Sequence, residues 1–388
     1  MPTIRLPAPN RELRPYDLPP AKTYMTAKPG EALPRKALAA AHVVVDPWAD
    51  NAPWTGVALD MDATLRFRHH LWDLGLGVAE AMDTAQRGMG LDWPNALALA
   101  RATLAEARTR KDSVVYVGAG TDHIDPATAT LERVVRAYLE QITAIQGVGG
   151  RVIVMASRAL ARVARGPGDY AQVYRSILAE AQQPVILHWL GPMFDPQLDG
   201  YWGSADLMTA MDRCLAVIAS EARKVEGIKI SLLDKNLEIA MRLRLPASVR
   251  MFTGDDFNYP ELIAGDGHQT SDALLGIFDP IAPIASAALK ALGSGDRAGY
   301  HATLDPTLAL SREIFQAPTW HYKTGVVMLA YLAGHQDHFA MLGGQQSARS
   351  MLHLGRVFRL AAELGLFPDP DLAARRMRNI LAPLGVEA

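Results

Sequence analysis

The chain has little of three features that would assign it early to a class of protein: cysteine, net charge and long apolar runs. Its 388 residues include one cysteine, Cys214, so a disulfide framework is excluded and a reducing compartment is expected. The formal net charge of -2 gives no basic excess that would indicate nucleic-acid binding. No apolar run approaches the ~18 residues of a membrane-spanning helix, and no signal-peptide pattern opens the sequence. We therefore expect a cytoplasmic protein with no nucleic-acid or membrane partner.

What the chain has is a large apolar fraction. Hydrophobic residues make up 49% of it, which is enough for a sizeable core and for one α/β barrel with insertions. Cys214 lies in an amphipathic helical pattern, so we expect a buried structural thiol rather than a nucleophile.

From residue 42 onward, short apolar runs alternate with segments of helical periodicity. The runs are continuous, which is typical of parallel strands covered on both faces. The predicted strands are 42–46, 78–83, 113–117, 151–155, 184–188, the strand that carries Lys229, 249–253 and 268–273. Eight strands, each followed by a helix, predict a TIM (β/α)8 barrel, with an open doubly wound sheet as the alternative.

We expect the chain to have three parts. Residues 1–41 are rich in proline and charge and form an N-terminal extension, in which residues 4–7 are one strand of a small hairpin. The barrel is expected over 42–281. Residues 282–388 are predicted to form a C-terminal helical segment that packs on the barrel, in the usual place for contacts between subunits.

One predicted strand carries an unusual residue. Lys229 lies between two isoleucines in a run that is typical of a fully buried strand, where lysine is rare without a partner. Desolvation disfavours the charged form of an amine and lowers its pKa, which favours attack on a carbonyl and formation of a Schiff base. The alternative is that Lys229 lies near the strand end and extends its ammonium group to solvent.

Polar and ionisable side chains follow the apolar strands at their predicted carboxyl ends, where TIM barrels carry their chemistry. They include Asp46, Asp83, Thr84, Asp122, His123, Ser157, Arg158, His188, Trp189, Lys229, Gly254, Asp255, Asp256, His268 and Gln269. This density predicts an enzyme.

Several short motifs occur in an order that resembles the dihydrodipicolinate synthase and N-acetylneuraminate lyase superfamily of class I aldolases and lyases. They are Val117-Gly-Ala-Gly120, the strand ending at His188, Gly227-Ile-Lys229, Thr253-Gly-Asp-Asp256, Gly265-Asp-Gly-His268 and Tyr322-Lys323. The resemblance covers about residues 42–342, and the chain is most similar to a divergent, long branch known mainly as a domain of unknown function. It implies a Schiff-base lysine at Lys229, no bound cofactor, and a homodimer or homotetramer.

The residues around the lysine depart from the family pattern. Where members with 2-oxo acid substrates have Gly-Thr-Thr-Gly-Glu after the second strand, this chain keeps Thr84, followed by Gln86 and Arg87. His188 replaces the fifth-strand tyrosine, and Ser157-Arg158 stands in place of an aromatic pair after the fourth strand. The arginine that holds a carboxylate after the fifth strand has no counterpart. These differences favour a sugar-derived ketone or 2-oxo sugar acid over pyruvate.

The resemblance and the strand ends together give a catalytic pair and a set of substrate-binding candidates. Lys229 is expected to form the imine, and His188 to take and return a proton at the substrate hydroxyl, unless it is a structural histidine. The expected substrate-binding residues are Asp46, Thr84, Gln86, Arg87, Arg158, Trp189, Gly254, Asp255 and His268.

Several of these candidates also have a structural interpretation. Arg87 and Arg158 can bind a substrate carboxylate or hydroxyl group, or can pair with a neighbouring aspartate such as Asp122. Asp255 can cap the short helix that follows it. Trp189 can form part of the core rather than a stacking surface for a sugar.

We expect a Schiff-base-forming class I aldolase or lyase that cleaves or dehydrates a small keto compound. One alternative is a metal-dependent sugar isomerase or epimerase on a similar barrel. Its divalent metal would be held by residues such as Asp122, His123, His188, Asp255 and His268. A second alternative is a sugar-binding barrel without catalytic activity.

Overall fold

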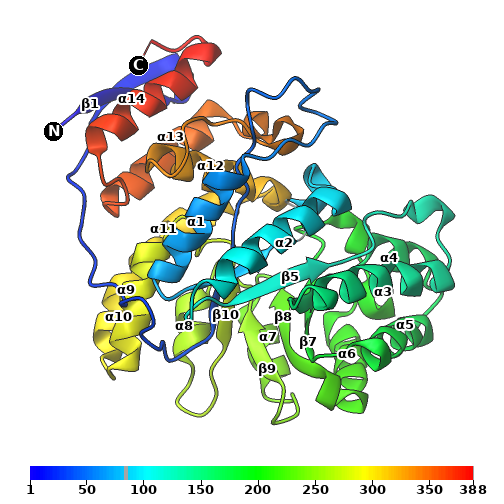
Figure 1. The fold of residues 1–388 in the computed structure, drawn as a ribbon. Helices are drawn as coiled ribbons and strands as arrows, with labels where there is room; N and C mark the ends of the chain where they lie inside the picture. Colours follow the sequence, from blue (N-terminus) through cyan, green and yellow to red (C-terminus); the bar gives the residue numbers. More distant parts are fainter. Residues whose placement is uncertain (83–85, 388) are drawn as a thin grey trace.

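Eight parallel strands close into a barrel at the centre of the protein (Figure 1). The computed structural model describes residues 1–82 and 86–387. The strands are hydrogen-bonded in the order β10-β3-β4-β5-β6-β7-β8-β9. Their bounds are β3 Ala37–Ala40, β4 Gly77–Glu80, β5 Val115–Ala119, β6 Arg151–Val154, β7 Val185–Leu190, β8 Val225–Ser231, β9 Arg250–Thr253 and β10 Asp272–Leu275. The predicted TIM barrel is therefore confirmed.

The first strand lies earlier than the sequence predicts. Strand β3 ends at Ala40, whereas the prediction placed the strand over 42–46 and ended the N-terminal extension at residue 41. The valine-rich segment after β3 lies outside the barrel, where Val45 forms an isolated antiparallel bridge with Leu59. The prediction was wrong because alanine has low strand propensity, while a run of valines is typical of a strand.

The last strand lies later than the sequence predicts. Strand β10 begins at Asp272 and pairs with β3 to close the barrel, whereas the prediction began it at residue 268. His268 and Gln269 are therefore in the loop before β10, with their backbone N–H groups donating to Asp266 Oδ1. This loop is at the amino-terminal end of the barrel.

Helices cover the outside of the barrel (Figure 1). They are α1 Met61–Asp73, α2 Trp93–Arg108, α3 Leu131–Gly147, α4 Arg158–Val163, α5 Pro167–Glu180, α6 Leu207–Ser220, α7 Lys235–Arg242 and α8 Tyr259–Ala264. Side-chain caps fix the start of most of them; Asp60, for example, accepts from Ala63 N at 2.8 Å. Within residues 1–82 and 86–387, no helix is both long and apolar enough to cross a lipid bilayer.

Inward-facing side chains fill the barrel. They form a buried group of Leu38, Ala40, Ala79, Met82, Tyr116, Ile153, Met155, Ile186, Phe252 and Leu274. Side chains at the alternate positions of each strand pack against the surrounding helices. The barrel interior is thus a packed core, and open space is left at its two ends.

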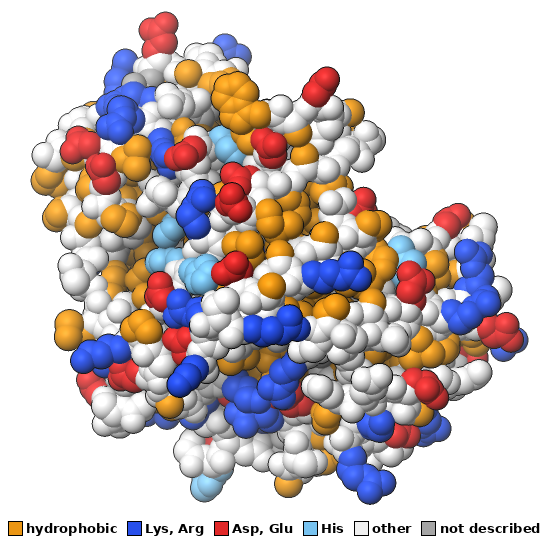
Figure 2. Space-filling model, in the orientation of Figure 1, with side chains coloured by type: hydrophobic (Ala, Val, Ile, Leu, Met, Phe, Trp, Pro, Cys, Tyr) orange, Lys and Arg blue, Asp and Glu red, His pale blue; other side chains and the backbone are white. Residues whose placement is uncertain are grey.

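A helical segment follows the barrel and packs against the N-terminal hairpin. Its helices are α9 Ala282–Gly293, α10 Arg297–Leu304, α11 Leu308–Ile314, α12 Tyr322–Leu332, α13 Met351–Glu363 and α14 Pro370–Leu381. The predicted hairpin is present as β1 Thr3–Ala8 and β2 Glu12–Asp17, and Tyr16 meets Phe358 of α13 edge to face. Figure 1 shows both chain ends at this corner of the molecule. On the face in Figure 2, acidic and basic side chains alternate over the upper part, while Lys and Arg gather below the centre.

Candidate functional site

Lys229 and His188 lie side by side near the carboxyl ends of two neighbouring strands. Strands β7 and β8 pair in parallel with His188 opposite Lys229, and the two side chains are 1% and 4% exposed. His188 is two residues beyond Ile186 of the interior group, so both project into the barrel. On β8, a Cβ at Gly227 would meet the interior ring of Phe252, so Lys229 also faces inward. The structure thus brings together the two residues that the sequence proposes as catalytic.

His188 is held in its neutral form. Burial, and then the positive charge of Lys229, hold the pKa of His188 well below the ordinary value of 6.5. Its Nε2 lies 3.1 Å from Ser231 Oγ, and its buried Nδ1 has no hydrogen-bond partner in the described part of the chain. In the tautomer in which Nε2–H donates to Ser231 Oγ, the lone pair of Nδ1 is left to accept a proton.

Gly254 gives Lys229 its space. A Cβ at this position would lie 2.6 Å from Lys229 Cε and 2.6 Å from the backbone oxygen of Ile230. The side chain can move away, but the strand backbone cannot without loss of pairing. In the structure Gly254 leaves room for the side chain of Lys229, and its contact with substrate stays a prediction.

Replacing Gly254 by alanine should lower the reactivity of Lys229 and destabilise the fold by about 1–3 kcal/mol, the usual cost of overpacking. Both effects follow from the close approach of the added Cβ to Lys229 Cε, to the backbone oxygen of Ile230 and to Ser231 Oγ. They can be measured as the rate of lysine modification by a small carbonyl compound and as the midpoint of urea unfolding. Gly168→Ala, in α5 with nothing within 4 Å of the added Cβ, is the control. Equal behaviour of the two variants would contradict this role.

A cavity of about 250 Å³ opens beside His188 at the carboxyl ends of β5, β6 and β7. It is lined by Arg87, Gly88, Gly120, Thr121, Asp122, Ile124, Pro126, Met155, Ala156, Arg158, Ala159, His188, Leu190 and Asp195. The cavity therefore lies at the end of the barrel where the sequence places the chemistry.

Both arginines that line the cavity are paired with aspartates. Arg87 forks onto Asp122, with Nη2 to Oδ1 at 2.6 Å and Nε to Oδ2 at 3.1 Å, and Arg158 Nε lies 2.5 Å from Asp195 Oδ2. Arg87 is also buried, donates to Gly118 O, and has its pKa lowered by desolvation. Arg87 thus pairs with Asp122 in the fold, as its structural interpretation requires. The charges of the cavity wall are balanced, with no excess of positive charge.

Two other candidates serve the structure rather than the cavity. Asp255 accepts hydrogen bonds from the backbone N–H groups of Phe257 and Asn258, which fixes the turn before α8, whereas the N-cap of the helix itself is Asn258, without a side-chain capping bond. Burial raises the pKa of this carboxyl. Trp189 alternates with His188 along β7 and packs in the layer between barrel and helices, out of the cavity.

Three further candidates lie away from this cavity, and one is not described. Asp46 is six residues beyond β3 and accepts from Trp48 N at 2.9 Å. Gln86 donates to Ala41 O and lines a separate cavity of about 20 Å³. His268 lies in the loop before β10, at the amino-terminal end of the barrel and away from the cavity beside His188. Thr84 lies outside the described residues.

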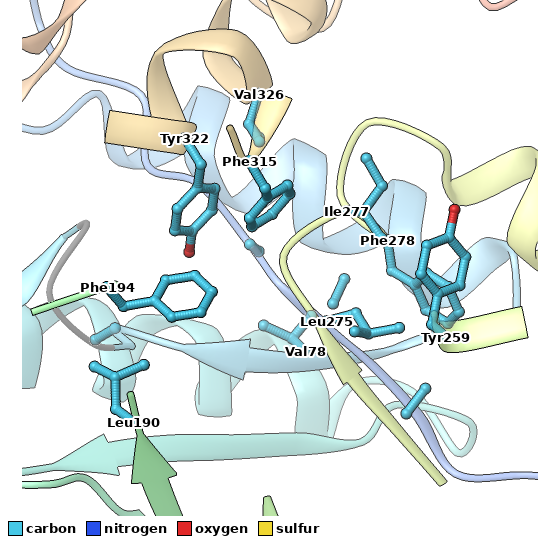
Figure 3. Close-up of a cluster of buried hydrophobic side chains, with 14 of the residues drawn as sticks. Val78, Leu190, Phe194, Tyr259, Leu275, Ile277, Phe278, Phe315, Tyr322 and Val326 are labelled. Atoms are coloured by element: carbon cyan, nitrogen blue, oxygen red, sulfur yellow. The ribbon is translucent and has the colours of Figure 1, made fainter. Parts of the chain in front are cut away.

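The structure adds residues that sequence reasoning missed. Tyr322 and Phe315 stack at 4.4 Å and meet Phe194, from the loop after β7, edge to face. Figure 3 shows Tyr322 extending from the C-terminal helices with its hydroxyl toward Phe194 and the end of β7 at Leu190. The sequence signal was the Tyr322-Lys323 motif, in which only the lysine was considered.

A second buried polar group lies beside the first strand. His42 Nδ1 is 2.8 Å from Asp279 Oδ2, and Lys323 donates to Ala40 O. His42 and Asp279 were both missed because the first and last strands were placed incorrectly. Among residues 1–82 and 86–387, no three His, Cys, Asp or Glu side chains are grouped as a metal site would require.

The fold is that of dihydrodipicolinate synthase family proteins. The chain superposes on a putative dihydrodipicolinate synthetase from Pseudomonas aeruginosa with a TM-score of 0.61 at 16% identity, covering 84% of this chain and 99% of that one. YagE, a prophage protein of that family from E. coli K12 in complex with pyruvate, gives 0.63 at 15% identity over 91% and 99%. The enzyme from Cyanidioschyzon merolae with lysine bound gives 0.64 at 13% identity over 85% and 98%.

Sequence comparison assigns the chain to a family. None of the curated proteins matches it in sequence. The model of the family described as "Protein of unknown function (DUF993)" matches residues 4–386. The chain therefore belongs to the DUF993 family, and its barrel has the fold of dihydrodipicolinate synthase family proteins.

Proposed function

We propose that this protein is a class I aldolase or lyase that forms an imine between Lys229 and a small keto compound. The observation that carries the proposal is the buried pair of Lys229 and His188, held opposite each other on β7 and β8, of which His188 lines a cavity at the carboxyl end of the barrel. A buried amine next to a neutral base is the arrangement that Schiff-base chemistry needs. No cofactor is required, because the imine itself acts as the electron sink.

The chemistry follows from the two side chains. The unprotonated Lys229 Nζ attacks the substrate carbonyl carbon, and loss of water from the adduct leaves a protonated imine. When His188 takes the proton from a hydroxyl on the β carbon, the bond between the α and β carbons breaks and its electrons pass into the imine, which becomes an enamine. The cleaved fragment leaves as an aldehyde or ketone. Protonation of the enamine and hydrolysis then release the second product and restore the amine.

The lining of the cavity supports a polyhydroxylated substrate. Its two arginines are each paired with an aspartate, so the wall offers both donors and acceptors at balanced charge. Thr121 adds a hydroxyl, whose oxygen lies 2.6 Å from Ser157 Oγ. Mixed donors and acceptors suit the hydroxyl groups of a sugar chain, whereas a free carboxylate is better matched by an unpaired arginine. We therefore propose a sugar-derived ketone or 2-oxo sugar acid.

The proposal is tested by trapping the imine. The protein is incubated with a panel of sugar ketones, 2-oxo sugar acids and pyruvate, reduced with borohydride, and analysed by mass spectrometry of its peptides. We expect a stable adduct on the peptide that contains Lys229, formed with a polyhydroxylated ketone more readily than with pyruvate. Absence of any lysine adduct across the panel would overturn the imine, and preference for pyruvate would overturn the substrate class.

Replacing His188 by glutamine should lower kcat for the best substrate by about 10²-fold, the lower part of the usual contribution of a general base. Trapping at Lys229 should persist, because His188 acts after the imine has formed. Since the pKa of His188 lies well below 6.5, the wild-type rate should show no step near the usual histidine pKa of about 6.5. A step there that disappears in His188→Gln would contradict the neutral-base role. His301→Gln, on α10, is the matched control.

A further inference from the structure

A second large cavity lies at the other end of the barrel, where the proposed reaction does not take place. Its volume is about 300 Å³, within the range of small-molecule sites. Four segments line it: the residues before β3, the end of α7 with the loop after it, the start of β9, and the loop before β10. The Lys and Arg side chains below the centre of Figure 2 gather on this side of the molecule.

Positive charge is in excess in this cavity. Its lining includes Arg35, Arg242 and Arg250, and one acidic residue, Asp272. Arg250 pairs with Asp272 through Nε, and Arg242 reaches Asp266 at the rim at 3.3 Å. Arg35 instead donates to two backbone oxygens, those of Ile263 and Pro34. One guanidinium group in the cavity is thus hydrogen-bonded to neutral groups alone.

Two lining residues also have polar atoms that nothing in the described part of the chain satisfies. Arg242 is 6% exposed, yet its Nε has no hydrogen-bond partner, and Gln269 Oε1 has none. Arg242 Nε is a buried donor and Gln269 Oε1 is an acceptor, and an unsatisfied group of either kind is costly unless a ligand or water satisfies it; of the two, the donor is the one that suits an anion. Burial lowers the pKa of Arg35, Asp272 opposes this shift, and the nearby guanidinium groups of Arg250 and Arg297 add to it. The site therefore has hydrogen-bond donors and a positive potential that suit an anion.

We propose that this cavity binds a small oxyanion, either a phosphate group or a carboxylate of a small metabolite, through Arg35, Arg242 and Arg250. Guanidinium groups recognise both kinds of oxyanion by paired hydrogen bonds. The ligand would connect the chain before β3 with the starts of β9 and β10, and the β10–β3 pair is where the barrel closes. Anion binding thus stabilises closure of the barrel from the end opposite to the proposed active site.

The test is a titration of the intact protein with inorganic phosphate and, in a separate arm, with citrate, each at constant ionic strength adjusted with sodium chloride. A ligand that binds only the folded state raises the unfolding temperature in a saturable way. We expect saturation in at least one arm, and the arm with the lower half-saturation concentration identifies the source of the oxyanion. Arg35→Gln should raise that concentration by about tenfold or more, since it removes a charge-assisted hydrogen bond.

The matched control is Arg244→Gln, which removes the same charge from an exposed pair with Asp212 outside the cavity and should leave the half-saturation concentration unchanged. Arg35→Lys keeps the charge without the fork and should give an intermediate value, which also serves if the glutamine variant does not fold. A non-saturating response in both arms of the wild type, or equal effects of Arg35→Gln and Arg244→Gln, would overturn the site. Imine trapping at Lys229 is measured in parallel, so failure of this site and failure of the proposed function are distinguished.

Discussion

Replacing Lys229 by methionine should abolish both the borohydride-trapped adduct and turnover, while the protein remains folded. Methionine matches the unbranched stem of the lysine and suits an apolar strand, but it has no amine to attack a carbonyl. Residue 229 pairs across β8 and β9 with Phe252 of the barrel interior, so an apolar side chain is tolerated at this inward-facing position. The measurements are mass spectrometry of the reduced protein, product formation, and circular dichroism to check the fold.

The chain offers a matched control in a second buried lysine. Lys323 of α12 is also 4% exposed and donates to Ala40 O beside the first strand. Lys323→Met should retain the adduct on the Lys229 peptide. If the adduct instead persisted in Lys229→Met and disappeared in Lys323→Met, the imine would belong to the C-terminal helix and the assignment to β8 would be wrong.

The barrel was predictable because most of its strands are continuous apolar runs. Strands β6, β7 and β9 were located within one or two residues, since buried parallel strands carry no alternation that could be confused with a surface strand. The first strand was missed for a physical reason. Its sequence is Ala37-Leu-Ala-Ala40, and these small side chains form a strand because they pack in the closed barrel. Local strand propensity does not include such tertiary packing.

The same error explains part of what was missed near the site. Because the first strand was placed too late, His42 was read as the start of a strand instead of a residue beyond its end. Because the last strand was placed too early, Asp279 was not considered at all. The two form a buried pair that joins the first and last strands, at 2.8 Å. Long-range pairs of this kind depend on where strands end, and strand ends are the least predictable feature of a sequence.

The pairing of Lys229 with His188 was predictable from topology alone. Consecutive strands of a barrel are neighbours, so residues at the carboxyl ends of β7 and β8 had to meet. Topology did not predict what Arg87 and Arg158 bind, because the direction of each side chain decides whether it contacts a substrate or an aspartate. The sequence marked Tyr322 through the Tyr322-Lys323 motif but could not predict its contact with Phe194, because the two residues are far apart along the chain.

Glu238 should make the protein less stable as the pH rises through the neutral range. This carboxyl of α7 is fully buried, and burial raises its pKa from 4.5 to about 7. The unfolded chain loses the proton near pH 4.5 while the folded chain keeps it to about pH 7, so deprotonation between these values favours unfolding. The stability is fully present below the unfolded pKa and is lost as the pH rises through the folded pKa. A difference of this size corresponds to about 3 kcal/mol.

Glu238→Gln isolates this effect, because glutamine keeps the shape of the side chain and does not titrate. Between pH 4.5 and pH 8, the free energy of unfolding of the wild type, measured with urea, should fall by about 3 kcal/mol relative to that of the variant. Ser271 Oγ donates to Glu238 Oε1 at 2.7 Å, and a glutamine oxygen accepts the same bond. Glu261→Gln, on the exposed face of α8, should follow the wild type. Parallel pH profiles for the wild type and Glu238→Gln would show that Glu238 is ionised in the fold, with a partner that compensates its burial.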